Sequence, residues 1–133
     1  MKILFLIPPA EHSLRKAHEK DNGYGLGRAY LMSYLKSHGH EVDTVPFNMC
    51  SDLEYMSNLK EKLNTFQPDV VSITMFSVNR VMGFKCIDFI EAYNHMRWVD
   101  GKKSIRIVVG GHHASALPKQ LTSRLTFILQ FSP

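Results

Sequence analysis

Five short runs rich in apolar residues recur along the chain, and each is followed by a turn or by a segment with helical periodicity. They cover residues 2–7, 41–45, 70–75, 105–109 and 126–131. Runs of this length bounded by proline or glycine are typical of strands, and an almost wholly apolar strand is expected where helices cover both faces of a sheet. The pattern therefore predicts five strands.

Helical segments are expected between these runs. Apolar residues recur at three- and four-residue spacing over 26–37, 52–66 and 79–99, and a short fourth helix is expected over 118–125. Ser51 or Asp52 is suited to cap the second of these helices. The apolar side chains at helical spacing are Leu26, Tyr30, Leu31, Tyr34 and Leu35, then Leu53, Met56, Leu59, Leu63 and Phe66, then Val81, Phe84, Ile87, Phe89, Ile90, Tyr93 and Trp98.

The alternation of strands and helices predicts an α/β fold: a three-layer, doubly wound, mostly parallel five-stranded sheet of Rossmann-like type. A chain of 133 residues suits a single domain, 1–133. In such sheets ligands bind outside the carboxyl ends of the strands, where the strand order reverses. The loops 8–25, 46–50, 76–79 and 110–116 are therefore expected along one rim.

Composition and charge narrow the function classes. The chain is 44% hydrophobic and has no apolar run as long as a membrane span, and the run 2–7 is too short for a secretory leader. We therefore expect a soluble, cytoplasmic protein with no membrane partner. The net charge is +4, but the sixteen lysines and arginines are scattered, so no nucleic-acid partner is expected.

Several kinds of chemistry lack their motifs. Cys50 and Cys86 lie far apart without CxxC spacing, which favours core thiols over a disulfide framework or a zinc site. The phosphate-binding patterns GxGxxG and GxxxxGK[ST] and the nucleophile pattern GxSxG are missing. Neither a nucleoside triphosphate nor hydrolase chemistry is expected, and no catalytic residue is assigned.

The segment IVVGGHHASALP, residues 107–118, leads from an apolar strand into paired glycines and paired histidines. Gly110 and Gly111 suit a place where backbone passes close to another group and leaves amides free, or a plain tight turn. His112 and His113 are neighbours and point to opposite sides of an extended chain, so they are a poor zinc pair and no metal site is expected.

The third strand also ends in polar residues. Thr74, Ser77 and Asn79 are expected to face the same crevice as the glycines. Ser77 and Asn79 suit capping of the following helix equally well.

Four pieces of the sequence occur in a meaningful order. They are Pro8-Pro9 after the first strand, GLGRAYLMSYLKSHGHEVDTV (25–45), QPDVVSITMFS (67–77) and IVVGGHHASALP (107–118). Together they resemble the N-terminal cobalamin-binding domain of cobalamin-dependent radical S-adenosylmethionine proteins, and the resemblance covers nearly the whole chain.

The resemblance implies a flavodoxin-like sheet with cobalamin lying across its carboxyl rim and the nucleotide tail of the cofactor beside the sheet. His12 and His18 do not fit the pattern Asp-x-His-x-x-Gly of other cobalamin domains, so a histidine ligand to cobalt is not expected. The positions that match the cofactor-binding segments of the family are Pro8, Pro9, Thr74, Ser77, Gly110, Gly111, His113, Ala114 and Ser115.

The catalytic half of such enzymes is not found in this sequence. It lacks the CxxxCxxC motif that holds the iron–sulfur cluster, and it ends in TFILQFSP without the GEGE of the family, which suggests a domain truncated at its C-terminus. We therefore expect a cobalamin-binding module without catalysis of its own, part of or derived from a radical enzyme, with a radical S-adenosylmethionine catalytic domain or a second copy as its protein partner.

Two alternatives stay open. The first is a cofactor-free, flavodoxin-like interaction or scaffold domain, as a monomer or a homodimer, in which Phe76, Met75 or the histidines fill the rim. A flavodoxin-like enzyme that uses flavin or a nucleotide is the second, and the missing phosphate loop disfavours it.

Overall fold

Strands and helices alternate along the chain in the computed structural model, which describes residues 1–9, 26–45, 51–76, 79–111 and 127–128. The loop 10–25 and the helix expected over 118–125 lie outside the described residues. The elements are β1 (Lys2–Leu6), α2 (Leu26–Ser37), β2 (Glu41–Thr44), α3 (Asp52–Phe66), β3 (Val70–Thr74), α4 (Arg80–Val99), β4 (Arg106–Gly110) and β5 (Phe127–Ile128).

The strands form one parallel sheet in the order β2-β1-β3-β4-β5. The predicted α/β class and the parallel direction are confirmed. A five-stranded sheet was predicted. Four strands, β1 to β4, have four or five residues each, and of the fifth, predicted over 126–131, the described residues include only the pair Phe127 and Ile128 beside β4. This order is compatible with a flavodoxin-like sheet.

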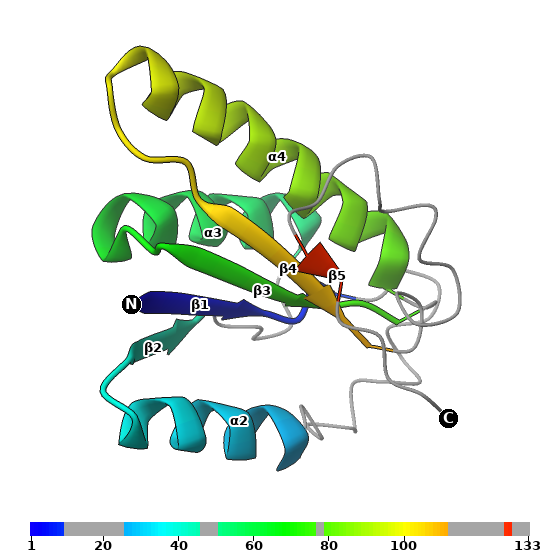
Figure 1. Ribbon diagram of the computed structural model, residues 1–133. Coiled ribbons are helices and arrows are strands. Elements are labelled where there is room, and N and C mark those ends of the chain that lie inside the picture. The colour runs from blue at the N-terminus through cyan, green and yellow to red at the C-terminus, as the bar shows by residue number, and fades with distance from the viewer. Residues whose placement is uncertain (10–25, 46–50, 77–78, 112–126, 129–133) are drawn as a thin grey trace.

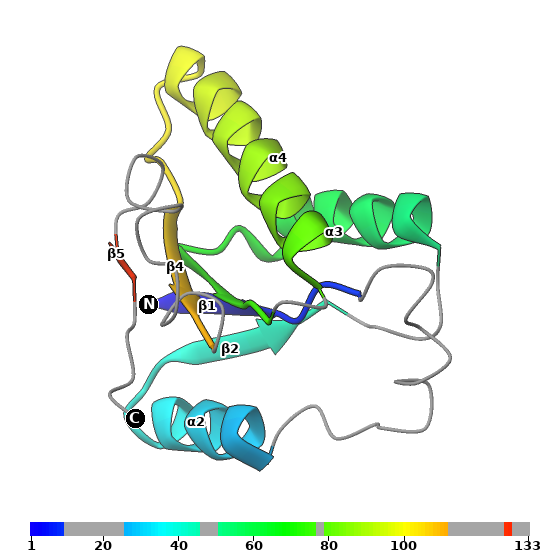
Figure 2. The ribbon, with the colours of Figure 1, turned by 90° about the vertical axis from the view of Figure 1, so that its right-hand side faces the viewer.

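Helices cover both faces of the sheet (Figure 1). α3 and α4 lie on one face, and α2 lies on the other, as the view turned by 90° also shows (Figure 2). A parallel pair of strands cannot be joined by a tight hairpin, so each connection crosses over a face of the sheet. The layers therefore follow from the strand direction.

Local sequence fixes the ends of α3. Ser51 is its N-cap, and the Ser51 hydroxyl accepts a hydrogen bond from the Glu54 N–H at 3.2 Å, as predicted for this position. At the other end Gln67 adopts a left-handed conformation with φ 51°, and its N–H donates to the carbonyl of Leu63. Pro68 follows and cannot continue the helix.

The main core lies between the sheet and the pair α3 and α4. β3 and β4 alternate in burial, so Val71, Ile73 and Val109 are fully buried while their neighbours are half-buried. This period of two is that of a strand with one strongly packed face. The helices meet these strands with Tyr55, Leu59, Leu63, Met82, Cys86, Ile87 and Ile90.

The helical stripes expected from the sequence are correct only in part. Leu53 is 84% exposed, and Tyr55 takes its place in the core. Tyr30, Leu31 and Tyr34 of α2 and Val81 and Trp98 of α4 are also exposed. A helix that contacts a single layer buries a narrow stripe, and the side chains at its margins stay in solvent.

The buried thiol of Cys86 gives the first prediction. Burial raises the pKa of Cys86 from 9.0 to about 12. The folded protein therefore holds this proton where the unfolded chain releases it, so the contribution of Cys86 to stability is present below pH 9 and is lost as the pH rises toward 12. Denaturant titrations at several alkaline pH values should show this decline.

A matched variant isolates the effect. Cys86→Ala should be less stable at neutral pH because it leaves a small cavity, and its stability should fall less steeply above pH 9 than that of the parent. Equal slopes for the two proteins would mean that the Cys86 thiol ionises normally. In a Cys50→Ser background, Cys86 should resist alkylation until the protein unfolds.

Candidate functional site

The chain reverses its winding direction between two neighbouring strands. β1 leads toward α2 on one face of the sheet, whereas β3 leads into α4 on the other face (Figure 1). Loops that depart in opposite directions leave a crevice at the carboxyl ends of the two strands, which is where ligands bind in sheets of this kind. The candidate site is therefore the edge formed by the ends of β1, β3 and β4.

Asn79 joins the ends of β1 and β3. It is 2% exposed, and its Oδ1 accepts a hydrogen bond from the Phe76 N–H at 2.7 Å. Its Nδ2 donates to the carbonyl of Pro8 at 3.1 Å and to that of Thr74 at 3.2 Å. Asn79 occupies the N-cap position of α4 but makes no capping bond with its side chain. The amide instead ties the segments that follow β1 and β3 to each other.

The end of β4 approaches the end of β3 so closely that a side chain has no room. The Met75 N–H donates to the Gly110 carbonyl at 2.8 Å, and Gly111 has a φ of +106°. A Cβ on Gly111 would lie 2.5 Å from the Met75 carbonyl oxygen. The close approach predicted for this glycine therefore exists, and the group that approaches is the neighbouring backbone.

Small and hydroxyl residues lie on the sheet face toward α2. Thr74 pairs with Gly110 and Ser72 pairs with Val108, and all four are half-buried. Residues paired side by side in a parallel sheet project to the same face, opposite to the fully buried Val71, Ile73 and Val109. We call Ser72, Thr74, Val108 and Gly110 the α2-side row. The row is a half-buried strip that ends at the carboxyl end of the sheet.

The structure brings together part of the predicted cofactor set. Pro8, Thr74, Gly110 and Gly111 meet at one edge through the bonds of Asn79 and Met75, and Pro8 and Pro9 are both buried. Ser77, His113, Ala114 and Ser115 lie outside the described residues. Ser72 was missed, although it shares the alternation of the strand with Thr74.

A cation also stands at this end of the sheet. Arg28, in the first turn of α2, donates from Nη1 to the Thr44 hydroxyl at 3.3 Å, and that hydroxyl donates to the Phe5 carbonyl at 3.1 Å. Thr44 is the last residue of β2, next to β1. The sequence motif contains this arginine, but its contact with β2 depends on the packing of α2 and was not predicted.

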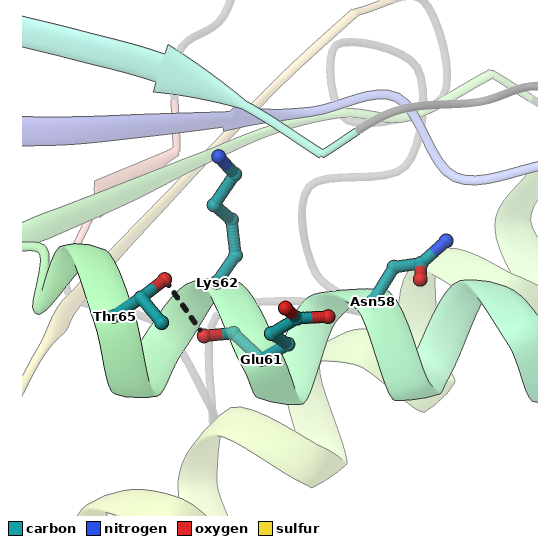
Figure 3. A pocket seen from close by; sticks show the side chains of 4 residues that line it. All are labelled: Asn58, Glu61, Lys62 and Thr65. Carbon is teal, nitrogen blue, oxygen red and sulfur yellow. Dashed lines mark hydrogen bonds between the residues drawn. The ribbon is translucent and has the colours of Figure 1, made fainter.

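A depression on α3 has a different character (Figure 3). Asn58, Glu61, Lys62 and Thr65 line it, all from one helix, and the Thr65 hydroxyl donates to the Glu61 carbonyl at 2.9 Å. Lys62 is turned toward β2, where its Nζ lies 2.8 Å from Asp43 Oδ2. The depression therefore belongs to the surface of α3 and not to the edge formed by the ends of β1, β3 and β4.

The ion pair beside this depression sets the charge of Asp43. Burial alone would raise the pKa of Asp43, but hydrogen bonds from Lys62 and the Thr44 N–H, with the charges of Lys62 and Lys36, hold it below its ordinary value. The carboxylate is thus ionised and already paired at neutral pH.

Metal chemistry receives no support from the placed side chains. Within residues 1–9, 26–45, 51–76, 79–111 and 127–128, no three histidine, cysteine, aspartate or glutamate side chains gather in a way that would hold a metal ion. No helix among these residues is both long and apolar enough to cross a bilayer.

Comparison of the chain with protein-family models, with curated proteins and with solved structures found no match. The function is therefore argued from the site itself.

Gly111 gives a prediction that separates backbone strain from steric overlap. Gly111→Ala should destabilise the protein by about 3 kcal/mol or more, since it adds an overlap with the Met75 carbonyl to an unfavourable φ. Gly39→Ala is the control, because Gly39 has a φ of +85° with no atom within 4 Å of the added Cβ. It should cost about 1–2 kcal/mol in chemical denaturation. Equal losses would contradict the close approach at Met75.

Asn79 gives a second prediction. Asn79→Ala should cost roughly 2–4 kcal/mol, because it leaves a buried N–H and two carbonyl groups without their partner. Asn79→Asp should be worse at neutral pH than at acidic pH, since an ionised carboxylate would face the carbonyl oxygens of Pro8 and Thr74. Thermal unfolding at two pH values measures both effects. A loss below about 0.5 kcal/mol for Asn79→Ala would show that the bridge is not needed.

Proposed function

We propose that the chain is a cobalamin-binding module of the radical S-adenosylmethionine enzyme type, without catalysis of its own. The observation that carries the proposal is the α2-side row at the carboxyl end of the sheet, beside the point where the winding direction reverses. A broad, flat ligand needs an edge with few side chains and with polar groups within reach. Thr74, Gly110 and Pro8 belong to this edge and match the family segments.

The residues present are chemically suited to such a cofactor. The hydroxyls of Ser72 and Thr74 can donate to the phosphate of a nucleotide tail, and they can donate to or accept from the amides of a corrin. Gly110 places no side chain beside Thr74, and Arg28 adds a positive charge at the neighbouring strand ends. When bound, cobalamin would supply a cobalt centre for the chemistry of a separate domain. The chain's own residues would bind and orient it.

Catalysis is assigned to another domain because this chain offers no cluster ligands. The sequence has two cysteines where an iron–sulfur cluster of that type needs three, and Cys86 is buried and protonated in the core. A cytoplasmic radical S-adenosylmethionine domain, or a second copy of the chain, would be the protein partner. We also propose that the fold is a three-layer, flavodoxin-like one.

A cofactor-free interaction domain is the second candidate, and one observation favours it. Gly111 is required by Met75 and the Asn79 amide is occupied by backbone partners, so neither residue needs a ligand to explain it. Met75 itself is not the expected plug of the rim, because its side chain points toward Gly83 of α4 and lies in the main core.

The test is retention of a corrin. Incubation with hydroxocobalamin followed by desalting should leave a corrin absorption spectrum on the folded protein. Thr74→Phe should weaken binding at least about tenfold by filling the α2-side row, a loss of about 1.4 kcal/mol or more. Val70→Phe places the same side chain on the same strand and face, but at its amino end, and should bind as the parent does.

The outcomes are distinct. A folded parent protein that retains no corrin would sink the cobalamin proposal and favour the cofactor-free domain. Equal loss in both phenylalanine variants, each checked for folding by circular dichroism, would place any ligand elsewhere. Gly111 is unsuitable for this test, since its substitution is expected to disturb the fold directly.

A further inference from the structure

The C-terminal end of α4 extends beyond the sheet. The helix has 20 residues and is about 30 Å long, whereas β3 and β4 have five residues each and span about 17 Å. Ile90 is the last buried residue of the helix. Its final turns form one extreme of the molecule in both views (Figures 1 and 2). This end lies at the amino ends of the strands, opposite the candidate cofactor edge.

Large apolar side chains are exposed on these turns. Met96, Trp98 and Val99 are 69%, 71% and 68% exposed. Single exposed apolar residues are ordinary, but three among the last four residues of a helix, one of them tryptophan, concentrate apolar surface at its end. We call Met96, Trp98 and Val99 the α4 tip. These side chains are exposed because they lie beyond Ile90, the last buried residue of α4.

Cationic residues lie beside the α4 tip, and hydrogen bonds hold the backbone around them. Lys102 and Lys103 follow it and are exposed. The Arg97 guanidinium stacks over Tyr93 at 5.9 Å and its Nε donates to the Lys103 carbonyl at 2.8 Å, while the Lys102 N–H donates to the Arg97 carbonyl at 2.8 Å. Arg97, Lys102 and Lys103 carry three positive charges, and Asp100 among them carries one negative charge. The tip is thus a small apolar projection with a positive rim.

We propose that the α4 tip is a peripheral contact for an anionic lipid bilayer. Tryptophan prefers the interface between water and lipid, where its apolar ring and polar N–H both find suitable surroundings. Lysines beside it are attracted by anionic headgroups. The absence of a spanning run, from which we expected no membrane partner, does not bear on a peripheral contact. The inference is independent of the cobalamin proposal.

Shape favours a bilayer over an acidic protein. A specific protein interface buries about 800 Å² on each partner and needs complementary shape, which three projecting side chains at a helix end do not provide. A bilayer surface needs no matching pocket, since lipids rearrange around a projection. The charge on the rim then decides which bilayers attract the tip.

The sole tryptophan of the chain reports on the contact directly. Vesicles of phosphatidylcholine with phosphatidylglycerol should shift the Trp98 emission to the blue, protect it from acrylamide and carry the full chain into the pellet on centrifugation. Vesicles of phosphatidylcholine alone should have little effect. Lys102→Gln combined with Lys103→Gln should lower partitioning by roughly 30-fold, at about 1 kcal/mol for each lysine.

Matched controls keep the result interpretable. Lys60→Gln combined with Lys85→Gln removes the same charge from exposed positions elsewhere and should leave partitioning close to that of the parent. Trp98→Ala should fold normally and sediment poorly with the anionic vesicles. An unchanged Trp98 spectrum with those vesicles, or equal losses in the two lysine pairs, would overturn the proposal. So would a blue shift that follows protein concentration without lipid, which would indicate a second copy.

Discussion

The close packing of backbone around Met75 is the constraint on which the rest of the structure depends. Met75 makes three close contacts. Its N–H donates to the Gly110 carbonyl, its own carbonyl lies against Gly111, and its side chain packs on Gly83 of α4. A Cβ on Gly83 would meet only the terminal methyl of Met75, which can move, whereas a Cβ on Gly111 would meet the Met75 backbone. The Met75 backbone thus requires a glycine at 111, while its side chain packs on the glycine at 83.

This packing divides the sheet into two unlike faces. On the side of α3 and α4, Met75 completes a core in which Val71, Ile73 and Val109 are fully buried, so no ligand can enter there without unfolding the domain. On the side of α2 the same strands carry half-buried residues and the exposed Arg106. The Asn79 bridge then holds the ends of β1 and β3 at a fixed separation. A ligand at this edge would therefore meet a preformed surface and would pay little to reorganise it.

Sequence patterns predicted the parts of this arrangement that depend on local chemistry. Apolar runs marked the four full strands, and Ser51 marked the start of α3, because strand burial and helix capping are read within a few residues. The glycine at 111 correctly indicated a close approach. The partner in that approach could not be predicted, since Met75 is distant in sequence and comes near only through the pairing of β3 with β4.

Long-range polar contacts were the other gap. Nothing near Asn79 in the sequence indicates that its amide reaches Pro8, 71 residues away, and capping was the more obvious role. The predicted buried stripe of α3 was wrong in part for a related reason. Tyr55 is buried and Leu53 is not, because the position of α3 over the sheet selects the buried residues together with hydropathy. Periodicity defines a stripe, but the layer that it packs against sets the margins of the stripe.

The mismatch between helix and strand length separates the two ends of the molecule. α4 begins at the carboxyl end of β3 and runs back past the amino end of β4, so its first turns support the candidate cofactor edge and its last turns leave the sheet. Gly83, in the first turn of α4, packs against the Met75 side chain, whereas Trp98, near the end of the helix, is 71% exposed. Side chains at the tip can therefore change with little effect on the packing around Met75. A chain that binds a cofactor at one end and a surface at the other would need this independence, and the length of α4 provides it.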